Sequence, residues 1–280
     1  MRAKVFAAIA FTAFLTAGPF ARGQFRPEEI SERGMWEEFL RTAEIVKAEP
    51  IGEGVTHPWR LYLKKDGLEK TAAWKNIDRN MGRGVMDSWK YEIAAYRLDR
   101  LIGLNMVPPT VEREYRKKRG ALSLWAETQY SLLDVSTQGI KIPESALNRV
   151  DDEKYITRLW YCLIANDDPT QQNIKYTEDW RSILIDHSRA FRSDREYTER
   201  LVFGVNGIKK NQADDKPFLI RRIPRALFEN IKALDVAGIQ KAVGPYLTRG
   251  EIEGVLARKK LILDEIALMI KQNGEDNVLY

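Results

Sequence analysis

The chain has 280 residues, of which 44% are hydrophobic and 30% are charged. This balance excludes an intrinsically disordered protein, and the length suffices for one large domain or two lobes with a shared cleft. The net charge of +5 does not indicate a nucleic-acid partner, because three basic residues and no acid lie in the first 23 residues and the charge is +2 without them. The single cysteine excludes an internal disulfide, and two histidines are too few for a multi-histidine zinc site.

The first 23 residues have the pattern of a secretion signal. Arg2 and Lys4 precede the apolar run Val5–Ala17, which is shorter than a membrane span requires. Ala21-Arg22-Gly23 offers small residues at the two positions that a signal peptidase reads, which predicts cleavage after Gly23. The alternative is an uncleaved anchor. We expect an exported protein with no stable membrane span after cleavage, in the periplasm or outside the cell if bacterial and in the secretory pathway otherwise.

A polar linker and an amphipathic helix are expected over residues 24–47. Residues 24–33 are polar, and apolar side chains then recur at helical spacing at Trp36, Phe39, Leu40, Ala43 and Val46. A glycine-containing stretch follows, in which Gly52 and Gly54 are one residue apart. Such glycines let a backbone bend tightly and approach a phosphate closely, although a plain turn has the same pattern.

A β-hairpin follows the glycines. Residues 60–64 alternate as a strand, Asp66-Gly67 predicts a tight turn, and residues 69–76 form the return strand. Ala73 and Lys75 share one face of that strand. The small side chain leaves room for an adenine ring, and the lysine can reach the α- and β-phosphates. The alternative is a solvated lysine on an edge strand.

A helix is expected from Ser88 to about Ile102, with Glu92 in its first turns and Gly103 as its stop. Glu92 is placed to hold a strand lysine, although a glutamate is also favoured near a helix start by the helix dipole. Strands are expected over residues 111–116 and 121–125, with a basic turn between them. The segment Glu127-Thr128-Gln129 then predicts a hinge whose backbone groups could read the adenine edge.

Two carboxylates and a carboxamide follow an apolar helix that is expected over residues 155–165. Asp168 lies in the polar stretch after this helix, Asn173 follows five residues later before a short strand, and Asp186 ends the apolar strand 182–185. Oxygen ligands held in this way suit Mg²⁺, which also shares phosphate oxygens with a nucleotide. This order of residues is typical of phosphoryl transfer, with Asp168 facing the attacking hydroxyl and Asn173 and Asp186 holding metal. The alternative is a polar loop that caps a helix and closes a turn.

The C-terminal part is expected to be mainly helical. Residues 201–220 are interpreted as an inserted loop or lid, and residues 225–234 as a helix. Thr248 and Glu251 form a capping box that begins a long amphipathic helix, and Gly274 follows its end.

The motifs IGEGV, AAWK, WKYEIAAYRLDRLIGL, DDPTQQN and LIDHSRAF resemble those of the atypical protein-kinase-like superfamily, in the expected order. The similar groups are the HipA-type kinases, the spore-coat and secretory-pathway kinases, and the phosphatidylinositol kinases. The resemblance covers residues 51–191 and implies a two-lobed α+β fold, with a β-rich N-lobe at 48–127 and a mainly helical C-lobe at 128–280. It also implies site roles: ATP binding by Gly52, Gly54, Ala73, Lys75, Glu92, Glu127 and Thr128, catalysis by Asp168, and Mg²⁺ or Mn²⁺ binding by Asn173 and Asp186.

The chain departs from the family pattern after the catalytic aspartate. Pro169 follows Asp168 where related kinases commonly have arginine, so a cation is missing from that position. Arg189 or Arg192 could supply the charge, or both could lie in a solvated loop. We expect an exported phosphotransferase that moves the ATP γ-phosphate to a hydroxyl, on a protein in preference to a small molecule or lipid. The alternatives are a nucleotide-binding pseudokinase, an adenylyl transferase, and an interaction module that binds no nucleotide.

Overall fold

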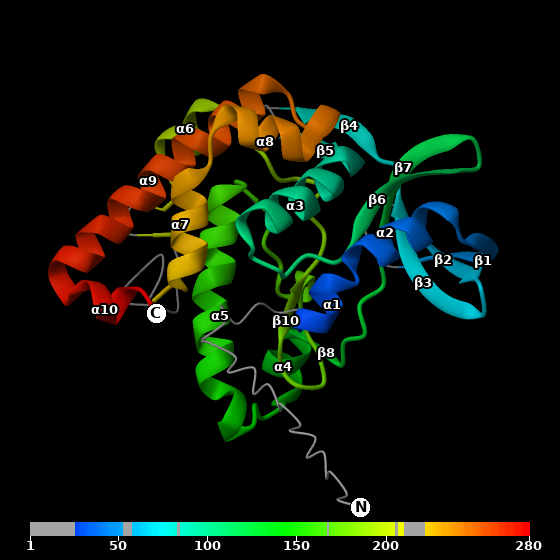
Figure 1. The fold of residues 1–280 in the computed structure, drawn as a ribbon, viewed down its shortest axis with the longest axis horizontal. Helices are drawn as coiled ribbons and strands as arrows, with labels where there is room; N and C mark the ends of the chain where they lie inside the picture. The colour runs from blue at the N-terminus through cyan, green and yellow to red at the C-terminus, as the bar shows by residue number, and fades with distance from the viewer. Residues whose placement is uncertain (1–25, 53–57, 83–84, 167, 205–206, 210–221) are drawn as a thin grey trace, which may run out of the picture.

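The computed structural model describes residues 26–52, 58–82, 85–166, 168–204, 207–209 and 222–280. In this part of the chain, an antiparallel sheet lies on one side and a group of helices on the other, with α3 (Trp89–Ile102) between them (Figure 1). The two parts have separate hydrophobic cores, of which the helical one is the larger. No helix of the described ranges is both long and apolar enough to cross a membrane.

The main sheet has five strands in the order β1-β2-β3-β7-β6, with every neighbouring pair antiparallel. Their bounds are β1 (Glu44–Pro50), β2 (Trp59–Lys65), β3 (Leu68–Lys75), β6 (Thr110–Tyr115) and β7 (Lys118–Leu124). The expected turn between β2 and β3 is confirmed, because Asp66 and Gly67 have φ values of 50° and 79°, as a tight hairpin turn requires. Arg116 and Lys117 adopt the same left-handed backbone in the basic turn between β6 and β7.

The two faces of the sheet are covered by different helices. Trp74 on β3 and Leu122 on β7 are buried against Phe39 and Leu40 of α2 (Arg33–Thr42). Ala121 lies directly opposite Lys75 in the β3–β7 ladder, and it packs against α3. Residues paired in this way share a face, so Lys75 lies on the α3 side of the sheet.

The helix expected to end near residue 47 ends at Thr42, and this part of the prediction is wrong. Ala43 is already extended, with φ −60° and ψ 143°, and Val46 lies in β1 with 53% of its surface exposed. Val46 fits the expected helical spacing by position, but the β-branched side chains of Ile45 and Val46 also favour strands, and pairing with β2 decides the outcome.

Helix α3 follows a two-stranded hairpin of β4 (Asp78–Gly82) and β5 (Val85–Ser88). Its predicted limits are confirmed, because the Ser88 side chain accepts the amide hydrogen of Lys90 and Gly103 adopts the left-handed conformation at the C-cap. The helix contacts β6 and β7 on one side and α7 and α8 on the other. It therefore joins the sheet to the helical region.

The helical region is built on α5 (Glu144–Leu163) and α9 (Arg249–Asn273), which contact each other; in Figure 1, α5 is upright and α9 runs obliquely to its left. Shorter helices complete it: α1 (Pro27–Ser31), α4 (Leu132–Gln138), α6 (Arg195–Glu199), α7 (Arg225–Ala233), α8 (Val236–Val243) and α10 (Glu275–Val278). The capping box at Thr248 and the stop at Gly274 are both confirmed for α9. Most of the expected loop or lid at 201–220 lies outside the described residues.

Arg258 of α9 is fully buried and connects three segments of the helical region. Its Nε donates to Leu163 O at 2.9 Å, and its Nη1 donates to Arg192 O at 2.6 Å and Tyr197 O at 3.3 Å. Burial lowers the pKa of this guanidinium. The side chain fastens α9 to the end of α5 and to the loop that follows residue 191.

A second sheet of β8 (Tyr130–Ser131), β9 (Ile174–Tyr176) and β10 (Ser182–Leu184) carries the expected metal residues. Asn173 ends a short 3-10 turn just before β9, and Asp186 lies two residues after β10. The Ile185 amide donates to Asn173 O at 3.0 Å. This bond brings Asn173 beside the segment that carries Asp186.

Candidate functional site

The centre of the site is the Lys75 ammonium group on β3. Its Nζ lies 2.7 Å from Glu92 Oε1 and 2.7 Å from Asp186 Oδ1. Glu92 comes from the first turn of α3, and Asp186 from the loop after β10. The expected Lys75–Glu92 pair is therefore present, and Asp186 completes a three-group cluster from three separate elements.

The charges of this cluster depend on one another. The Lys75 and Glu92 side chains are only 14% and 6% exposed, whereas that of Asp186 is 44% exposed. Burial alone would lower the pKa of Lys75, but the charges of Asp186 and Glu92 raise it above its usual value. Burial raises the pKa of Glu92 despite the lysine, whereas Lys75 holds the pKa of Asp186 below its usual value against the effect of burial. Lys75 is thus a fixed cation at neutral pH.

His187 fixes the second carboxylate oxygen of Glu92. Its backbone amide donates to Glu92 Oε2 at 3.0 Å, and its ring is fully buried. Trp160 Nε1 donates to His187 Nε2 at 3.2 Å, so the ring nitrogen that faces Trp160 carries no proton. Burial lowers the pKa of His187 to about 3. The ring is therefore neutral at pH 7, and the backbone amide of His187 is the group that positions Glu92.

Asp186 has a left-handed backbone with φ 61°, which is uncommon for a residue other than glycine. Ser188 Oγ donates to Asp186 Oδ1 at 3.3 Å, and Lys75 uses the same oxygen. Asp186 Oδ2 accepts no hydrogen bond from the described residues. A backbone held in a sparsely populated conformation, presenting a carboxylate oxygen that the protein does not use, is typical of a ligand site.

Asp168 pairs with Arg189, three residues after Asp186, and Asn173 ends the 3-10 turn that contacts Ile185. The Asp168 amide donates to Asn166 Oδ1 at 3.2 Å, and its side chain is 44% exposed. Its Oδ2 accepts from Arg189 Nη1 at 2.9 Å. Asp168 is thus an accessible carboxylate that faces a guanidinium.

The side chains of Asp186 and Asn173 offer the kind of oxygen donor that a magnesium ion prefers. The described residues contain no group of three or more His, Cys, Asp or Glu side chains arranged around one metal position. Mg²⁺ in nucleotide sites commonly uses one or two protein oxygens together with phosphates and water. The unused Asp186 Oδ2 and the Asn173 carboxamide are the side-chain groups that could hold it.

The structure describes some, but not all, of the residues that we expect to contact a nucleotide. Gly52 is exposed, a side chain there would meet nothing within 4 Å, and the neighbouring Ile51 amide donates to Pro58 O at 2.8 Å. Gly54 lies outside the described residues. Ala73 shares the Lys75 face, because the intervening Trp74 is buried on the other side.

At the expected hinge, backbone amides are available to a ligand, whereas the Glu127 side chain is engaged elsewhere. The Glu127 side chain is 85% exposed and pairs with Lys70 at 2.7 Å. The amides of Glu127 and Thr128 make no hydrogen bond to other residues of the described segments, whereas the Gln129 amide donates to Tyr176 O at 2.8 Å. The amides of Glu127 and Thr128 are therefore the ones available to a ligand.

Asp87, Asn166 and Tyr161 lie at the site but were not identified from the sequence. All three are buried, and each has side-chain atoms without a hydrogen-bond partner in the described part of the chain. Asp87 lies in β5, directly before the Ser88 helix cap, where an acid is ordinary and gives no signal. Asn166 begins the polar stretch after α5, and this position was the one available clue. Tyr161 follows the apolar pattern of α5 and could not be distinguished from core.

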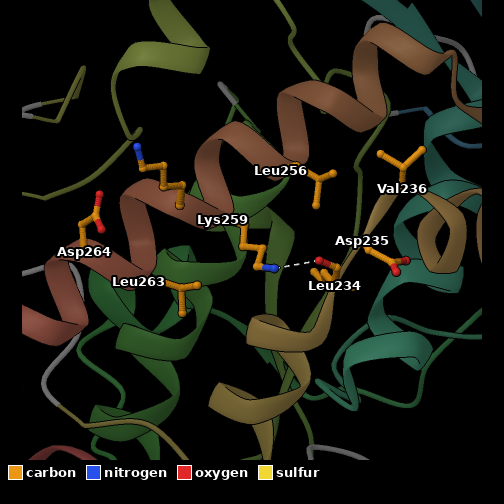
Figure 2. A pocket seen from close by; sticks show the side chains of 8 residues that line it. Leu234, Asp235, Val236, Leu256, Lys259, Leu263 and Asp264 are labelled. Atoms are coloured by element: carbon orange, nitrogen blue, oxygen red, sulfur yellow. Dashed lines mark hydrogen bonds between the residues drawn. The ribbon is translucent and has the colours of Figure 1, made fainter.

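A surface hollow of about 490 Å³ lies elsewhere, between α9 and the junction of α7 and α8 (Figure 2). Leu234, Val236, Leu256 and Leu263 line it together with charged side chains, and Lys259 Nζ donates across it to Leu234 O at 2.7 Å. Its lining includes none of the residues expected to bind a nucleotide. The candidate site is therefore identified by its chemistry and not by the size of a hollow.

Comparison with known proteins identifies the fold. No protein-family model matches the sequence, and no curated protein matches it. The chain is similar to a solved structure of hydra Fam20 with sugar, at 17% identity and a TM-score of 0.58, covering 91% of this chain and 93% of that chain. It is also similar to the Golgi casein kinase solved with Mn and ADP, at 15% identity and a TM-score of 0.59, covering 89% of this chain and 78% of that chain. The two-part α+β architecture expected from the sequence is confirmed, and the chain shares the fold of these two solved structures.

Proposed function

We propose that the chain is an atypical kinase that binds ATP with Mg²⁺ or Mn²⁺ and transfers the γ-phosphate to a hydroxyl group. The observation that carries the proposal is the position of Lys75 Nζ, 2.7 Å from both Glu92 and Asp186. Phosphoryl transfer needs a fixed cation beside the phosphates and a carboxylate beside the metal, and this cluster joins the two. The Golgi casein kinase, solved with Mn and ADP, supports nucleotide and metal binding by analogy of fold.

The nucleotide would lie on the α3 side of the sheet. Ala73 would leave room for the adenine ring, and the amides of Glu127 and Thr128 would meet its edge. Gly52, together with Gly54 outside the described residues, is assigned to the phosphates from the sequence. Lys75 binds the α- and β-phosphates. Mg²⁺ held by Asp186 and Asn173 supplies positive charge to the phosphate oxygens when bound.

Asp168 is assigned to the acceptor hydroxyl. The hydroxyl oxygen attacks the γ-phosphorus, and its proton passes to the Asp168 carboxylate. As the new oxygen–phosphorus bond forms, the bond from the γ-phosphorus to its bridging oxygen breaks, and the electron pair leaves with ADP. The exposure of Asp168 leaves it accessible to an incoming hydroxyl.

We infer that the acceptor is a protein hydroxyl and that the chain is exported after cleavage near Gly23, which lies outside the described residues. The lobes would meet at residues 127–128. A casein kinase among the similar structures supports a protein acceptor, and the Fam20 structure with sugar makes a sugar hydroxyl the alternative.

Intact-mass analysis after incubation with Mg-ATP tests the proposal. A gain equal to one or more phosphoryl groups on the chain or on dephosphorylated casein is expected. A gain equal to AMP would instead show adenylyl transfer. If neither the mass nor the melting temperature rises at millimolar Mg-ATP, the chain is instead an interaction module that binds no nucleotide.

A pseudokinase is the second candidate, favoured by Pro169 in place of the arginine that related kinases commonly have. It predicts that Mg-ATP raises the melting temperature while no phosphoryl group is transferred. Calorimetric binding measured beside transfer separates this case from an active enzyme.

A further inference from the structure

One arginine lies between two carboxylates at the edge of the site. Arg189 Nη1 lies 2.9 Å from Asp168 Oδ2, and Arg189 Nε lies 3.6 Å from Asp87 Oδ2. The Arg189 and Asp168 side chains are 28% and 44% exposed, so both are partly accessible to solvent. One guanidinium thus spans an accessible carboxylate and a buried one.

The buried carboxylate is unusual. Asp87 is 0% exposed, and neither of its oxygens accepts a hydrogen bond from the described residues. Burying a carboxylate without full hydrogen bonding is costly, and Arg189 is the cation paired with it. The geometry of this pair is fixed by the backbone, because the neighbouring Ser88 amide donates to Ser188 O at 2.8 Å. Asp87 and Arg189 are thereby held opposite each other.

The other arginine considered from the sequence is occupied elsewhere. Arg192 Nε donates to Asp194 Oδ2 at 2.9 Å, and its guanidinium lies 4.3 Å from the centre of the Tyr197 ring. Of the two, Arg189 is the one that contacts Asp168.

We propose that Arg189 is a further catalytic residue that binds the transferred phosphoryl group, and that Asp87 is the positioning residue that holds it there. The inference rests on the proposed kinase function. A guanidinium one hydrogen bond from Asp168 is also close to the point where the acceptor oxygen and the γ-phosphorus must meet. When the hydroxyl takes its place at Asp168, Nη1 exchanges the carboxylate for γ-phosphoryl oxygens, while Nε stays beside Asp87.

This exchange supplies charge where the transition state needs it. As the acceptor oxygen bonds to the γ-phosphorus and the bond to the bridging oxygen of ADP breaks, negative charge spreads over the phosphoryl oxygens. The hydroxyl proton goes to Asp168, which Arg189 has vacated. An arginine in this role commonly accelerates transfer by roughly 10³–10⁵-fold. Arg189 therefore supplies the positive charge that is missing at position 169, where this chain has proline.

The test compares Arg189→Ala, Arg189→Lys and Asp87→Asn with the wild type. Arg195→Ala is the matched control, since Arg195 is 87% exposed and pairs with Glu199. Two quantities are measured for each full-length protein: Mg-ATP affinity by calorimetry, and single-turnover transfer from labelled ATP to casein, to the chain itself and to water. Melting temperatures identify any variant that fails to fold.

Arg189→Ala is expected to retain Mg-ATP affinity within about threefold and to lose roughly 10³-fold in transfer rate. Added methylguanidinium should restore part of that rate, which it could not do if Arg189 only supported the fold. Arg189→Lys should recover less than about tenfold, because a lysine lacks the fork that reaches two groups. Asp87→Asn should slow transfer and add little to Arg189→Ala in the double variant, because the two residues act as one unit.

Transfer by Arg189→Ala at the wild-type rate overturns the inference and leaves the kinase proposal intact. If methylguanidinium does not restore transfer by a folded Arg189→Ala variant, the inference is also overturned and the kinase proposal also remains intact. If the wild type binds Mg-ATP but transfers nothing to any of the three acceptors, the proposed function fails and the role of Arg189 fails with it.

Discussion

Replacing Lys75 by methionine should destabilise the protein before any nucleotide is added. Methionine keeps the length of the side chain and removes the charge, which leaves Glu92 and Asp186 without the cation between them. Removing one partner of a buried ion pair costs about 3–5 kcal/mol. The Asp186 side chain is 44% exposed and therefore partly screened, so we expect the lower end, about 3 kcal/mol.

For a chain of this size, about 3 kcal/mol corresponds to a fall of roughly 6–12 °C in melting temperature. Thermal unfolding at neutral pH without nucleotide measures it. Lys70→Met is the matched control on the same strand, because Lys70 is 33% exposed and its partner Glu127 is 85% exposed. An exposed pair of this kind contributes less than about 1 kcal/mol. Glu92→Gln in the Lys75→Met background should restore much of the loss. The reasoning is refuted if Lys75→Met melts with the wild type, or if the Lys70 control falls as far.

Three further outcomes follow from the same geometry. Asp168→Asn should bind Mg-ATP with near wild-type affinity in calorimetry but lower labelled-phosphate transfer by roughly 10²–10⁴-fold; an unchanged rate would remove Asp168 from the reaction. Asp186→Ala should bind ATP equally well with and without Mg²⁺, and a retained Mg²⁺ effect would place the metal elsewhere. The pKa of His187 is about 3 in the folded state and 6.5 for a histidine in water, so protonation favours unfolding and stability falls as the pH drops from 6.5 towards 3. His187→Gln should lack this component, worth about 2–3 kcal/mol at about pH 4.5, and wild-type and variant melting temperatures that fall in parallel from about pH 7 to 4.5 would contradict it.

Local signals explain which parts of the fold could be predicted from sequence. The Asp66-Gly67 turn, the Ser88 cap, and the Thr248 capping box each depend on residues within a few positions, and all three are confirmed. Helix α8 (Val236–Val243) was not predicted, because its eight residues give too short a periodic pattern. The end of the helix before β1 was misplaced because strand pairing with β2, a tertiary interaction, overrode a helical spacing.

The candidate site shows the same difference between local signals, which the sequence contains, and tertiary contacts, which it does not. Alternation along β3 places Ala73 and Lys75 on one face, and the sequence order of Glu92, Asp168 and Asp186 is enough to suggest a shared cleft. Sequence could not show that Lys75 contacts Asp186 as well as Glu92, because the contact spans 111 positions. It also left Arg189 and Arg192 as equal alternatives, since two arginines three residues apart differ only in what the fold brings beside them.

The buried Arg258 connects the last long helix to the two loops that carry the proposed catalytic residues. Its guanidinium binds carbonyl oxygens of Leu163 and Arg192, which lie near the start of the Asp168 loop and just after the segment that carries Asp186 and Arg189. The amides of these two loops should therefore exchange with solvent at rates set by the opening of α9, although α9 contributes no group to the reaction. Under the proposed kinase function, a substitution in α9 that removes the Arg258 contacts should lower phosphoryl transfer, although it changes no residue assigned to ATP.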